Sequence, residues 1–283
     1  MSTIHSSSVE AARKALGTRL REIRRDAGLT GRVVSQRAGW NPSKTSRLEN
    51  GVTPPSDADI RTWCELCEAT DQAADLIAAS RSTDSMYVEW RRVQRSGLRR
   101  LQEAVVPLFE RTKVFRVYSS TLVPGLLQTA SYATALLSDI TQFRNTVNDV
   151  PEAVQARMAR TDRVLYHGNH RFAFLIEESV LRYQVGDADT MAAQLGHLLT
   201  VMAMPSVSIG VLPFSSSRRM WAVETFSLFD DSQAQVELLS ANVNLTGPSE
   251  VALYVKAFAH FGEQAVYGAR VRALVTRALE SLG

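Results

Sequence analysis

The residues with the clearest chemical potential are a group of cations near the N-terminal end. Residues 11–50 contain ten Lys and Arg side chains and three Asp or Glu, a net charge of +7 in a chain whose formal net charge is +3. A local excess of this kind is the electrostatic pattern of a face that binds phosphates. A basic helix face that contacts only solvent has the same composition, so charge alone leaves both interpretations open.

Cysteine and histidine side chains could ligate a metal. Cys64 and Cys67 have Cys-x-x-Cys spacing, and His167 and His170 have His-x-x-His spacing. About a hundred residues separate the two pairs, and no finger-like sequence surrounds either. We therefore expect two buried thiols on one helix face and a surface loop with two histidines, and we predict no metal site and no cofactor.

Carboxylates and sulfur-containing side chains offer weaker signals for a site. Glu177 and Glu178 follow an expected strand, where adjacent side chains point apart, which favours structural roles over catalysis. Glu177, Met202, Met204 and Trp221 are a candidate ligand pocket, with core packing as the alternative for the apolar residues. The chain has no phosphate-cradling glycine loop, no G-x-S-x-G elbow and no H-E-x-x-H motif. We predict no catalytic residues and no enzyme activity.

Five short helices are expected to position the cations. The first has an apolar stripe at Leu16, Leu20 and Ile23 and ends at Gly28. N-caps and turn glycines separate the next two. The expected helices are about Ala11–Ala27, Gly31–Ala38, a third opened by Asn41 and Pro42 and closed by Gly51, a fourth from Ser56 or Asp57 to about Ala69, and Ala73–Ser80.

After the helical domain, the sequence pattern predicts strands as well as helices. We expect a disordered lead over residues 1–10, the helical domain over 11–80, a linker over 81–85 and an α+β domain over 86–283, with a small antiparallel or mixed sheet. A helical segment is expected from Met86 to about Val114. Further expected strands are 172–176, 207–212, 225–229, 235–239 and 242–245, and expected helices are 188–202, 248–261 and 265–282.

The second and third helices, joined by a turn with Gly39, have the layout of a helix-turn-helix. The second helix of such a unit fits the major groove of double-stranded DNA, while the first crosses the backbone. The planar guanidinium of Arg47 on the third helix matches guanine O6 and N7, with a contact to phosphate alone as the alternative.

This unit resembles the Cro/repressor-like helix-turn-helix family, also called the XRE type. The likeness rests on Ile23-Arg24, Gly28-Leu29-Thr30, Gly39, Ser46 through Gly51, and Pro54. It implies base-facing positions for Arg47, Ser43, Asn41 and Pro42. It implies phosphate contacts for Lys44, Thr30, Gly31, Arg32 and Asn50, and a structural salt bridge between Arg24 and Glu49. Two residues depart from the family, which usually has Gln in place of Gly31 and Ala in place of Ser35.

The C-terminal part resembles the actinobacterial Scr-type antitoxin-like transcriptional regulators. The likeness rests on Trp90, Val123 through Thr129, Tyr132-Ala133, Ile176 through Arg182, Gln194-Leu195, Val211 through Pro213, and Phe226. Proteins of this kind are often encoded beside a small partner protein, so the resemblance implies such a partner here.

We therefore expect a sequence-specific transcription regulator, homodimeric on a partly palindromic operator because one module reads few bases. The C-terminal domain would respond to a ligand or protein. An antitoxin-like protein that mainly binds its neighbour-encoded partner is the alternative, and an enzyme with an appended DNA-binding domain is a third. Without a signal peptide or an apolar run of about 20 residues, we expect a cytoplasmic, nucleoid-associated protein and no membrane partner.

Overall fold

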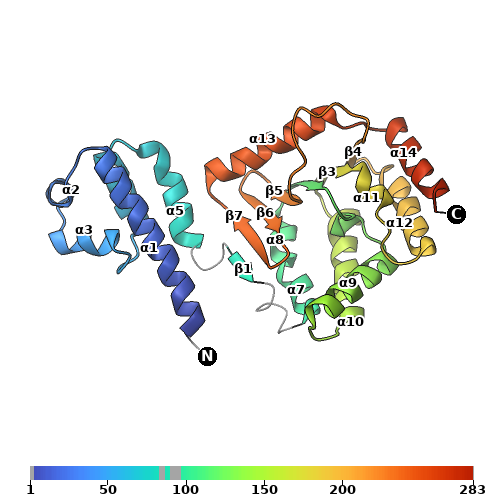
Figure 1. Cartoon of the computed structure of the whole chain (residues 1–283), viewed down its shortest axis with the longest axis horizontal. Coiled ribbons are helices and arrows are strands. Elements are labelled where there is room, and N and C mark those ends of the chain that lie inside the picture. Colours follow the sequence, from blue (N-terminus) through green and yellow to red (C-terminus); the bar gives the residue numbers. More distant parts are fainter. Residues whose placement is uncertain (1–2, 83–86, 90–96, 283) are drawn as a thin grey trace. The chain divides into compact units, whose positions relative to one another are not determined.

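The computed structural model describes residues 3–82, 87–89 and 97–282. The chain divides into two compact units, one comprising residues 1–87 with 245–250 and the other 88–244 with 251–283. Figure 1 shows helices alone over the first 82 residues and a sheet with helices in the second unit. The predicted order of a helical N-terminal region followed by an α+β domain is confirmed.

The N-terminal unit is a set of short helices around one small core. The largest fully buried side chains in it are Leu20, Leu48, Ile60 and Trp63. The Trp63 indole donates a hydrogen bond to the Leu20 carbonyl at 3.0 Å, so the polar end of this buried ring is satisfied. Its elements are α1 (Thr3–Asp26), α2 (Gly31–Ala38), α3 (Pro42–Glu49), α4 (Asp57–Leu66), η1 (Thr70–Gln72) and α5 (Ala73–Ser82).

Two boundaries differ from expectation. The first helix begins at Thr3, so residues 3–10 are helical and not a disordered lead. No Gly or Pro interrupts the chain before Gly17, which lets the helix extend toward the N-terminus. The linker expected at 81–85 starts inside α5, and its residues 83–85 lie outside the described residues.

Close approach between α1 and α3 requires glycine at two positions. A Cβ on Gly17 would lie 2.6 Å from the Leu48 carbonyl oxygen, and one on Gly51 would lie 2.7 Å from the Lys14 backbone nitrogen. Gly51 also has a φ of 68°, in the left-handed region. These glycines allow the two helices to pack backbone against backbone.

The second unit holds a mixed sheet in the order β1-β7-β6-β5-β2-β3-β4. Strand β2 pairs in parallel with β3 and antiparallel with β5, so the parallel and antiparallel halves meet at β2. Strands β3 and β4 pair in parallel, and β5 and β6 pair antiparallel. The strands are β1 (Tyr87–Glu89), β2 (Val114–Ser119), β3 (Arg171–Glu177), β4 (Val207–Leu212), β5 (Phe226–Phe229), β6 (Gln233–Glu237) and β7 (Ala241–Leu245).

Helices complete this unit. Helix α14 packs against α11, α12 and β4, while α10 packs against α7 and α9. Rings of Phe109, Phe115, Phe172 and Phe229 meet in one aromatic cluster of the core. The helical elements are α7 (Leu98–Ala104), α8 (Val106–Arg111), η2 (Gly125–Leu127), α9 (Ala130–Arg144), α10 (Val150–Thr161), η3 (Asp162–Tyr166), α11 (Glu178–Arg182), α12 (Ala188–Val201), α13 (Pro248–Gln264) and α14 (Ala269–Glu280).

The long helix expected over Met86–Val114 is wrong. The described part holds β1, two short helices and the first residue of β2. Gly97, with a φ of 91°, precedes α7, and Pro107 lies in the first turn of α8, where it removes a backbone donor. Trp90, part of the resemblance above, lies outside the described residues.

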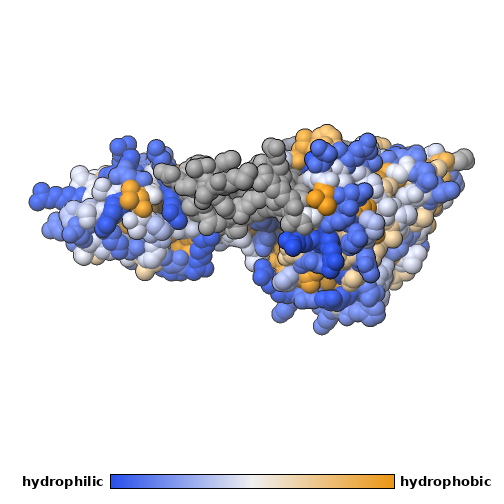
Figure 2. Space-filling view, turned by 90° about the horizontal axis from the view of Figure 1, so that it is seen from below, coloured by the Kyte–Doolittle hydropathy of each residue, from blue (hydrophilic) through white to orange (hydrophobic). Residues whose placement is uncertain are grey.

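The surface in view is mostly hydrophilic. Figure 2 shows scattered hydrophobic residues over both units and a largely hydrophilic N-terminal unit on this face. None of the helices in the described part of the chain combines the length and apolar character needed to cross a membrane.

A distant carboxylate caps α7. Gly97 at its N-cap has no side chain, and the Asp149 carboxylate accepts hydrogen bonds from the Leu98 nitrogen at 2.8 Å and the Arg99 nitrogen at 3.0 Å. A Cβ on Gly97 would lie 2.4 Å from Asp149 Oδ2, so glycine also makes room for the cap.

We expect Asp149→Ala to destabilise the second unit by about 1–2 kcal/mol, because two helix-start N–H groups lose their acceptor. Asp149→Asn, which keeps one acceptor oxygen, should have a smaller effect. Calorimetric melting of the full chain measures both. The exposed Glu152, also near this helix start, is the charge control. An equal loss in Glu152→Ala would contradict the capping role.

Candidate nucleic-acid interface

The turn between α2 and α3 is built from local capping residues. The Thr30 side chain accepts a hydrogen bond from the Val33 nitrogen at the start of α2, and Gly39 ends the helix in the left-handed conformation. The Asn41 side chain caps α3, and Pro42 occupies its first turn, where a missing N–H costs little. These residues end α2 and begin α3, so α3 is a separate helix that follows a short turn.

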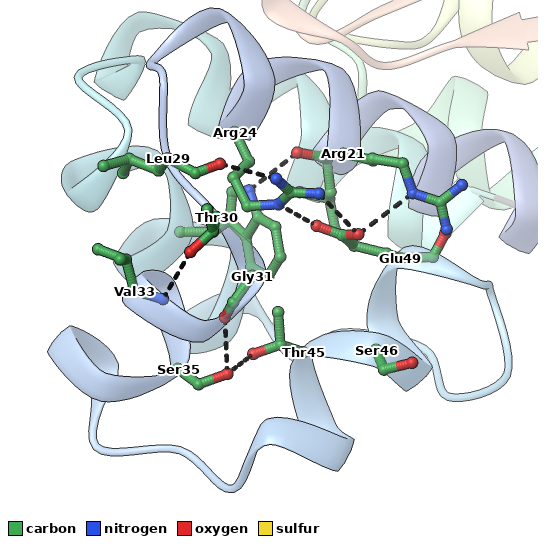
Figure 3. Close-up of polar contacts among 12 residues, drawn as sticks. Arg21, Arg24, Leu29, Thr30, Gly31, Val33, Ser35, Thr45, Ser46 and Glu49 are labelled. Atoms are coloured by element: carbon green, nitrogen blue, oxygen red, sulfur yellow. Dashed lines mark hydrogen bonds and ion pairs between the residues drawn. The ribbon is translucent and has the colours of Figure 1, made fainter.

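The Glu49 carboxylate is the hub that fastens α3 to α1. Arg24 Nε donates to Glu49 Oε1 at 2.5 Å and its Nη2 donates to Oε2 at 3.1 Å, while Arg21 Nε donates to Oε2 at 3.2 Å. Figure 3 shows both guanidinium groups directed at this one carboxylate. The structure thus brings together the Arg24 and Glu49 pair expected from the resemblance, and adds Arg21, which sequence reasoning missed.

Low exposure indicates that the Arg24–Glu49 ion pair holds the fold together and is not a contact surface. The side chains of Arg24 and Glu49 are only 12% and 10% exposed. The hydrogen bond with Glu49 raises the pKa of Arg24, which strengthens its charged state. Arg24 Nη1 also donates to the Leu29 carbonyl at 2.7 Å, so the same side chain holds the segment that leads into α2.

A pair of hydroxyl groups joins α2 to α3. Ser35 is 2% exposed, and its hydroxyl donates to the Gly31 carbonyl at 2.9 Å and lies 2.6 Å from the Thr45 hydroxyl. Because the single Ser35 hydrogen is directed to Gly31, Thr45 is the donor between the two hydroxyls (Figure 3). Ser35, a departure from the related family, therefore satisfies a buried Thr45.

The outer face of α3 is polar and exposed. Thr45, Leu48 and Glu49 point into the unit and are buried. The exposed residues of this segment are Asn41, Pro42, Ser43, Ser46, Arg47 and Asn50. Ser46 was absent from the expected base-facing group, although its spacing of three from Ser43 could have indicated the shared face.

Internal bonds already occupy two of these polar side chains. Asn41 Oδ1 accepts from the Ser43 nitrogen at 2.9 Å, so its oxygen is engaged as a cap. Asn50 Nδ2 donates to the Ser46 carbonyl at 2.8 Å and to the Ser46 hydroxyl at 3.3 Å, and Asn50 Oδ1 accepts from Arg21 at 2.6 Å. The Ser46 hydroxyl keeps its own hydrogen as a donor. Arg47 donates from Nε to the Ser43 carbonyl at 3.3 Å and is otherwise exposed. The side chains best placed to meet a ligand are Arg47, Ser43 and Ser46.

Lys44 points elsewhere than expected. The resemblance implied a phosphate contact, but the Lys44 ammonium lies 2.6 Å from Asp59 Oδ1 and 4.4 Å from the centre of the Trp40 ring. Burial acts to raise the pKa of Asp59, yet the Lys44 ammonium and hydrogen bonds from Ser56 hold that pKa below its usual value. Lys44 therefore links α3 to α4 in the unbound protein.

The start of α2 presents backbone donors and a cation. Thr30 and Arg32 are exposed, and Gly31 is half-buried between them. The first N–H groups of a helix lack acceptors within that helix and favour anions. A Cβ on Gly31 would meet only Thr45 Cγ2 at 3.6 Å, so there is space for a side chain here.

The cysteines and histidines do not form a shared site. Cys64 and Cys67 are buried free thiols, and burial raises the pKa of Cys64 to about 11, which disfavours a thiolate. His167 and His170 lie in the loop between η3 and β3. No cluster of three potential metal ligands occurs among the residues that the structure describes.

The candidate ligand pocket of the second unit does not gather its four expected residues. Glu177 is buried, accepts from the Tyr118 hydroxyl at 2.9 Å and is ion-paired with Arg218. Met202 and Met204 pack against the main core, and Trp221 is 75% exposed. Glu178 takes other partners, Arg182 and the Phe214 nitrogen, so the two adjacent carboxylates point apart. Their roles are structural: they hold neighbouring segments.

Two family models match the chain. Residues 15–77 match a helix-turn-helix domain, which confirms the predicted helix-turn-helix unit. Residues 102–277 match a domain of unknown function, DUF5753. No curated protein matches the chain.

Two solved structures have a weak likeness. One is Nuc, a phospholipase D family member from Salmonella typhimurium, with 9% identity and a TM-score of 0.34, over 59% of this chain and 90% of that one. The other is TrmBL2, an archaeal chromatin protein described as having a novel mode of DNA binding, with 11% identity and a TM-score of 0.32, over 85% and 88%. Neither score supports a shared fold or function.

We expect Ser35→Ala to destabilise the N-terminal unit by about 1–3 kcal/mol, because the buried Thr45 hydroxyl loses its acceptor. The double variant Ser35→Ala with Thr45→Val removes both hydroxyls and should recover most of that loss. Thermal unfolding of the four proteins in this cycle gives the coupling energy. Additive effects of the two substitutions would show that the hydroxyl pair contributes nothing.

Proposed function

Because the chain belongs to the DUF5753 family and carries a helix-turn-helix domain at residues 15–77, we propose that it is a sequence-specific DNA-binding transcription regulator. The observation that carries the proposal is the outer face of α3, where Arg47, Ser43 and Ser46 are exposed on a helix whose inner face is fixed to α1 and α2. A helix held in this way can enter the major groove as a rigid body.

Arg47 is the proposed base reader. Arg47 is exposed, and within the described part of the chain its side chain makes one hydrogen bond, from Nε to the Ser43 carbonyl, which leaves both terminal nitrogens available. The terminal nitrogens are suited to the O6 and N7 acceptors of guanine. Ser43 and Ser46 hydroxyls would accept or donate beside it, and Pro42 would contribute an apolar contact.

Phosphate contacts are assigned to the start of α2. Thr30, Gly31 and Arg32 combine backbone donors at a helix N-terminus with an exposed cation. Asn41 and Asn50 would support the reading face as caps of α3. Lys44 would contact phosphate only after leaving Asp59, so we assign it to stability first.

We further propose a homodimer on a partly palindromic operator in the cytoplasm, since a single module of this kind buries only about 600–1,000 Å² on DNA. The DUF5753 domain would respond to a ligand or a protein. The resemblance to Scr-type antitoxin-like regulators supports a second candidate function, binding of a small neighbour-encoded protein with DNA binding for autoregulation. Selection of an operator sequence with and without the small neighbour-encoded protein separates the two candidate functions. Only the second candidate function has that small protein as the main ligand.

Arg47→Ala is expected to lower affinity for the selected operator by about 1–3 kcal/mol and to leave non-specific DNA binding nearly unchanged, because a base contact is lost. The matched control is Arg19→Ala, since the Arg19 guanidinium of α1 is hydrogen-bonded to Glu22 and Gln72 and not to α3. Fluorescence anisotropy with operator and scrambled duplexes measures both.

Two results would contradict this role of Arg47. An equal loss on operator and scrambled DNA would make it a phosphate contact. No enrichment of any sequence motif by the wild-type protein would overturn the proposed function itself.

Gly31→Gln is expected to raise affinity for all DNA sequences a few-fold, because the site has space for a side chain that can donate to phosphate. Gly31→Ala fills the same space without a donor and serves as its control. Binding measured over a salt series distinguishes them, and equal affinities for the two variants would show that a side chain at position 31 does not reach a phosphate.

A further inference from the structure

The second unit contains a partly open cavity of about 260 Å³ between its sheet and its helices. Phe174, Val117, Ser227 and Gln235 form one register row across β3, β2, β5 and β6, and all four line the cavity. Helices α7, α8, α9 and α10 supply the opposite wall. The volume is close to the lower end of the range of about 300–1,000 Å³ for small-molecule sites.

Three arginines and one glutamate line this cavity. Arg144 comes from the end of α9, Arg157 and Arg160 come from α10, and Glu237 comes from the end of β6. Apolar side chains, including Phe109, make up most of the remaining wall. Among the described residues, neither Arg157 nor Arg160 forms an ion pair with Glu237 within 4.0 Å. The cavity therefore has an excess of positive charge and an apolar wall beside it.

The two arginines of α10 are held by amide groups and not by acids. Gln102 Oε1 accepts from Arg157 Nε at 3.2 Å and from Arg160 Nη1 at 3.0 Å. Arg157 also donates to Gln128, and the Arg160 guanidinium lies 4.8 Å from the centre of the Phe109 ring. These contacts fix the direction of the guanidinium groups without neutralising them.

Unsatisfied buried atoms lie at the same place. Arg160 is 6% exposed, and its Nε has no hydrogen-bond partner in the described structure. The same holds for Asn242 Oδ1, which also belongs to a cavity-lining residue. A buried guanidinium N–H without an acceptor is costly, and an anionic ligand oxygen would remove the cost at Arg160 Nε.

The charge of Arg160 persists at neutral pH. Burial lowers the pKa of Arg160 to about 9, with a further lowering from Arg157, so Arg160 stays protonated at pH 7. Burial raises the pKa of Glu237, while Arg157, Arg144 and Arg160 act to lower it. One carboxylate cannot balance the two guanidinium groups of Arg157 and Arg160.

We propose that this cavity binds a small organic anion. Its carboxylate or phosphate group would lie beside Arg157 and Arg160, and an apolar body about the size of one ring would pack against the wall that includes Phe109 and Val117. Arginine suits this role because its planar donors match both anions. The inference rests on the proposed function only in taking the DUF5753 domain as the part that responds to a ligand.

Benzoate and phenyl phosphate are the probes, with benzamide as the neutral match for benzoate. Calorimetric titration of the full chain without DNA should show at least tenfold tighter binding of one anion than of benzamide, because the neutral amide gains nothing from the arginines. Thermal unfolding in the same ligands should show a higher melting temperature with that anion. The ratio of the two anions identifies the carboxylate or the phosphate as the preferred group.

Two variants with opposite expected signs test the site. Arg157→Gln should weaken anion binding about tenfold or more, while Glu237→Gln should tighten it about three- to tenfold by removing a repulsive charge. Arg163→Gln, outside the cavity and ion-paired with Glu110, should change nothing. A folding defect lowers affinity in every variant, so tighter binding in Glu237→Gln cannot arise from damage.

The proposal is overturned if neither anion binds, if benzamide binds as tightly as benzoate, or if Glu237→Gln weakens binding as Arg157→Gln does. Because these measurements contain no DNA, such failures leave the proposed DNA-binding function untouched. Loss of operator binding in the wild-type protein would in turn leave the cavity result standing.

Discussion

The DNA-facing unit depends on one buried carboxylate. Glu49 accepts hydrogen bonds from Arg21 and Arg24, and so ties the last turn of α3 to α1. A pair of charges at such low exposure is expensive to break, because the remaining partner keeps its desolvation cost without its counter-ion. Gly17 brings the two backbones close enough for this arrangement. The position of the whole reading helix follows from these contacts.

The two faces of α3 consequently have separate tasks. The inner face is occupied by packing and internal bonds, through Thr45 to Ser35, Leu48 in the core and Glu49 to α1. Even part of the outer face is engaged, since Asn41 and Asn50 bond to their own helix. The outward groups that remain are few, which concentrates sequence reading on Arg47 and the serines beside it.

Local chemistry explains what could be predicted from sequence. The bounds of α2 and α3 follow from Thr30, Gly39, Asn41 and Pro42, which act within a few residues of themselves. The partner of Lys44 is Asp59, fifteen positions away on another helix, so a helix-face argument alone could not find it. Strand β2 was missed because an amphipathic pattern before it masked a short apolar alternation in Val114–Ser119.

The cavity shows more clearly what could not be predicted from the sequence. Each of its arginines looks like an ordinary surface cation on an amphipathic helix. Only the packing of α9 and α10 over the sheet brings Arg144, Arg157 and Arg160 to one cavity with Glu237, which lies 77 to 93 positions further along the chain. Tertiary topology, not local pattern, creates such a site.

Strand β2 pairs with a strand more than a hundred residues later, and this separation affects the order in which parts of the protein form during translation. Strand β2 cannot pair with β5 until Phe226–Phe229 has been synthesised, and the cavity lining also includes Glu237 and Asn242. The helices α1–α5 are complete within the first 82 residues. At about 5–20 residues per second, roughly 10 to 40 s pass between the synthesis of Gly51 and that of Asn242. During translation, each new molecule therefore has its reading helix before it has its cavity.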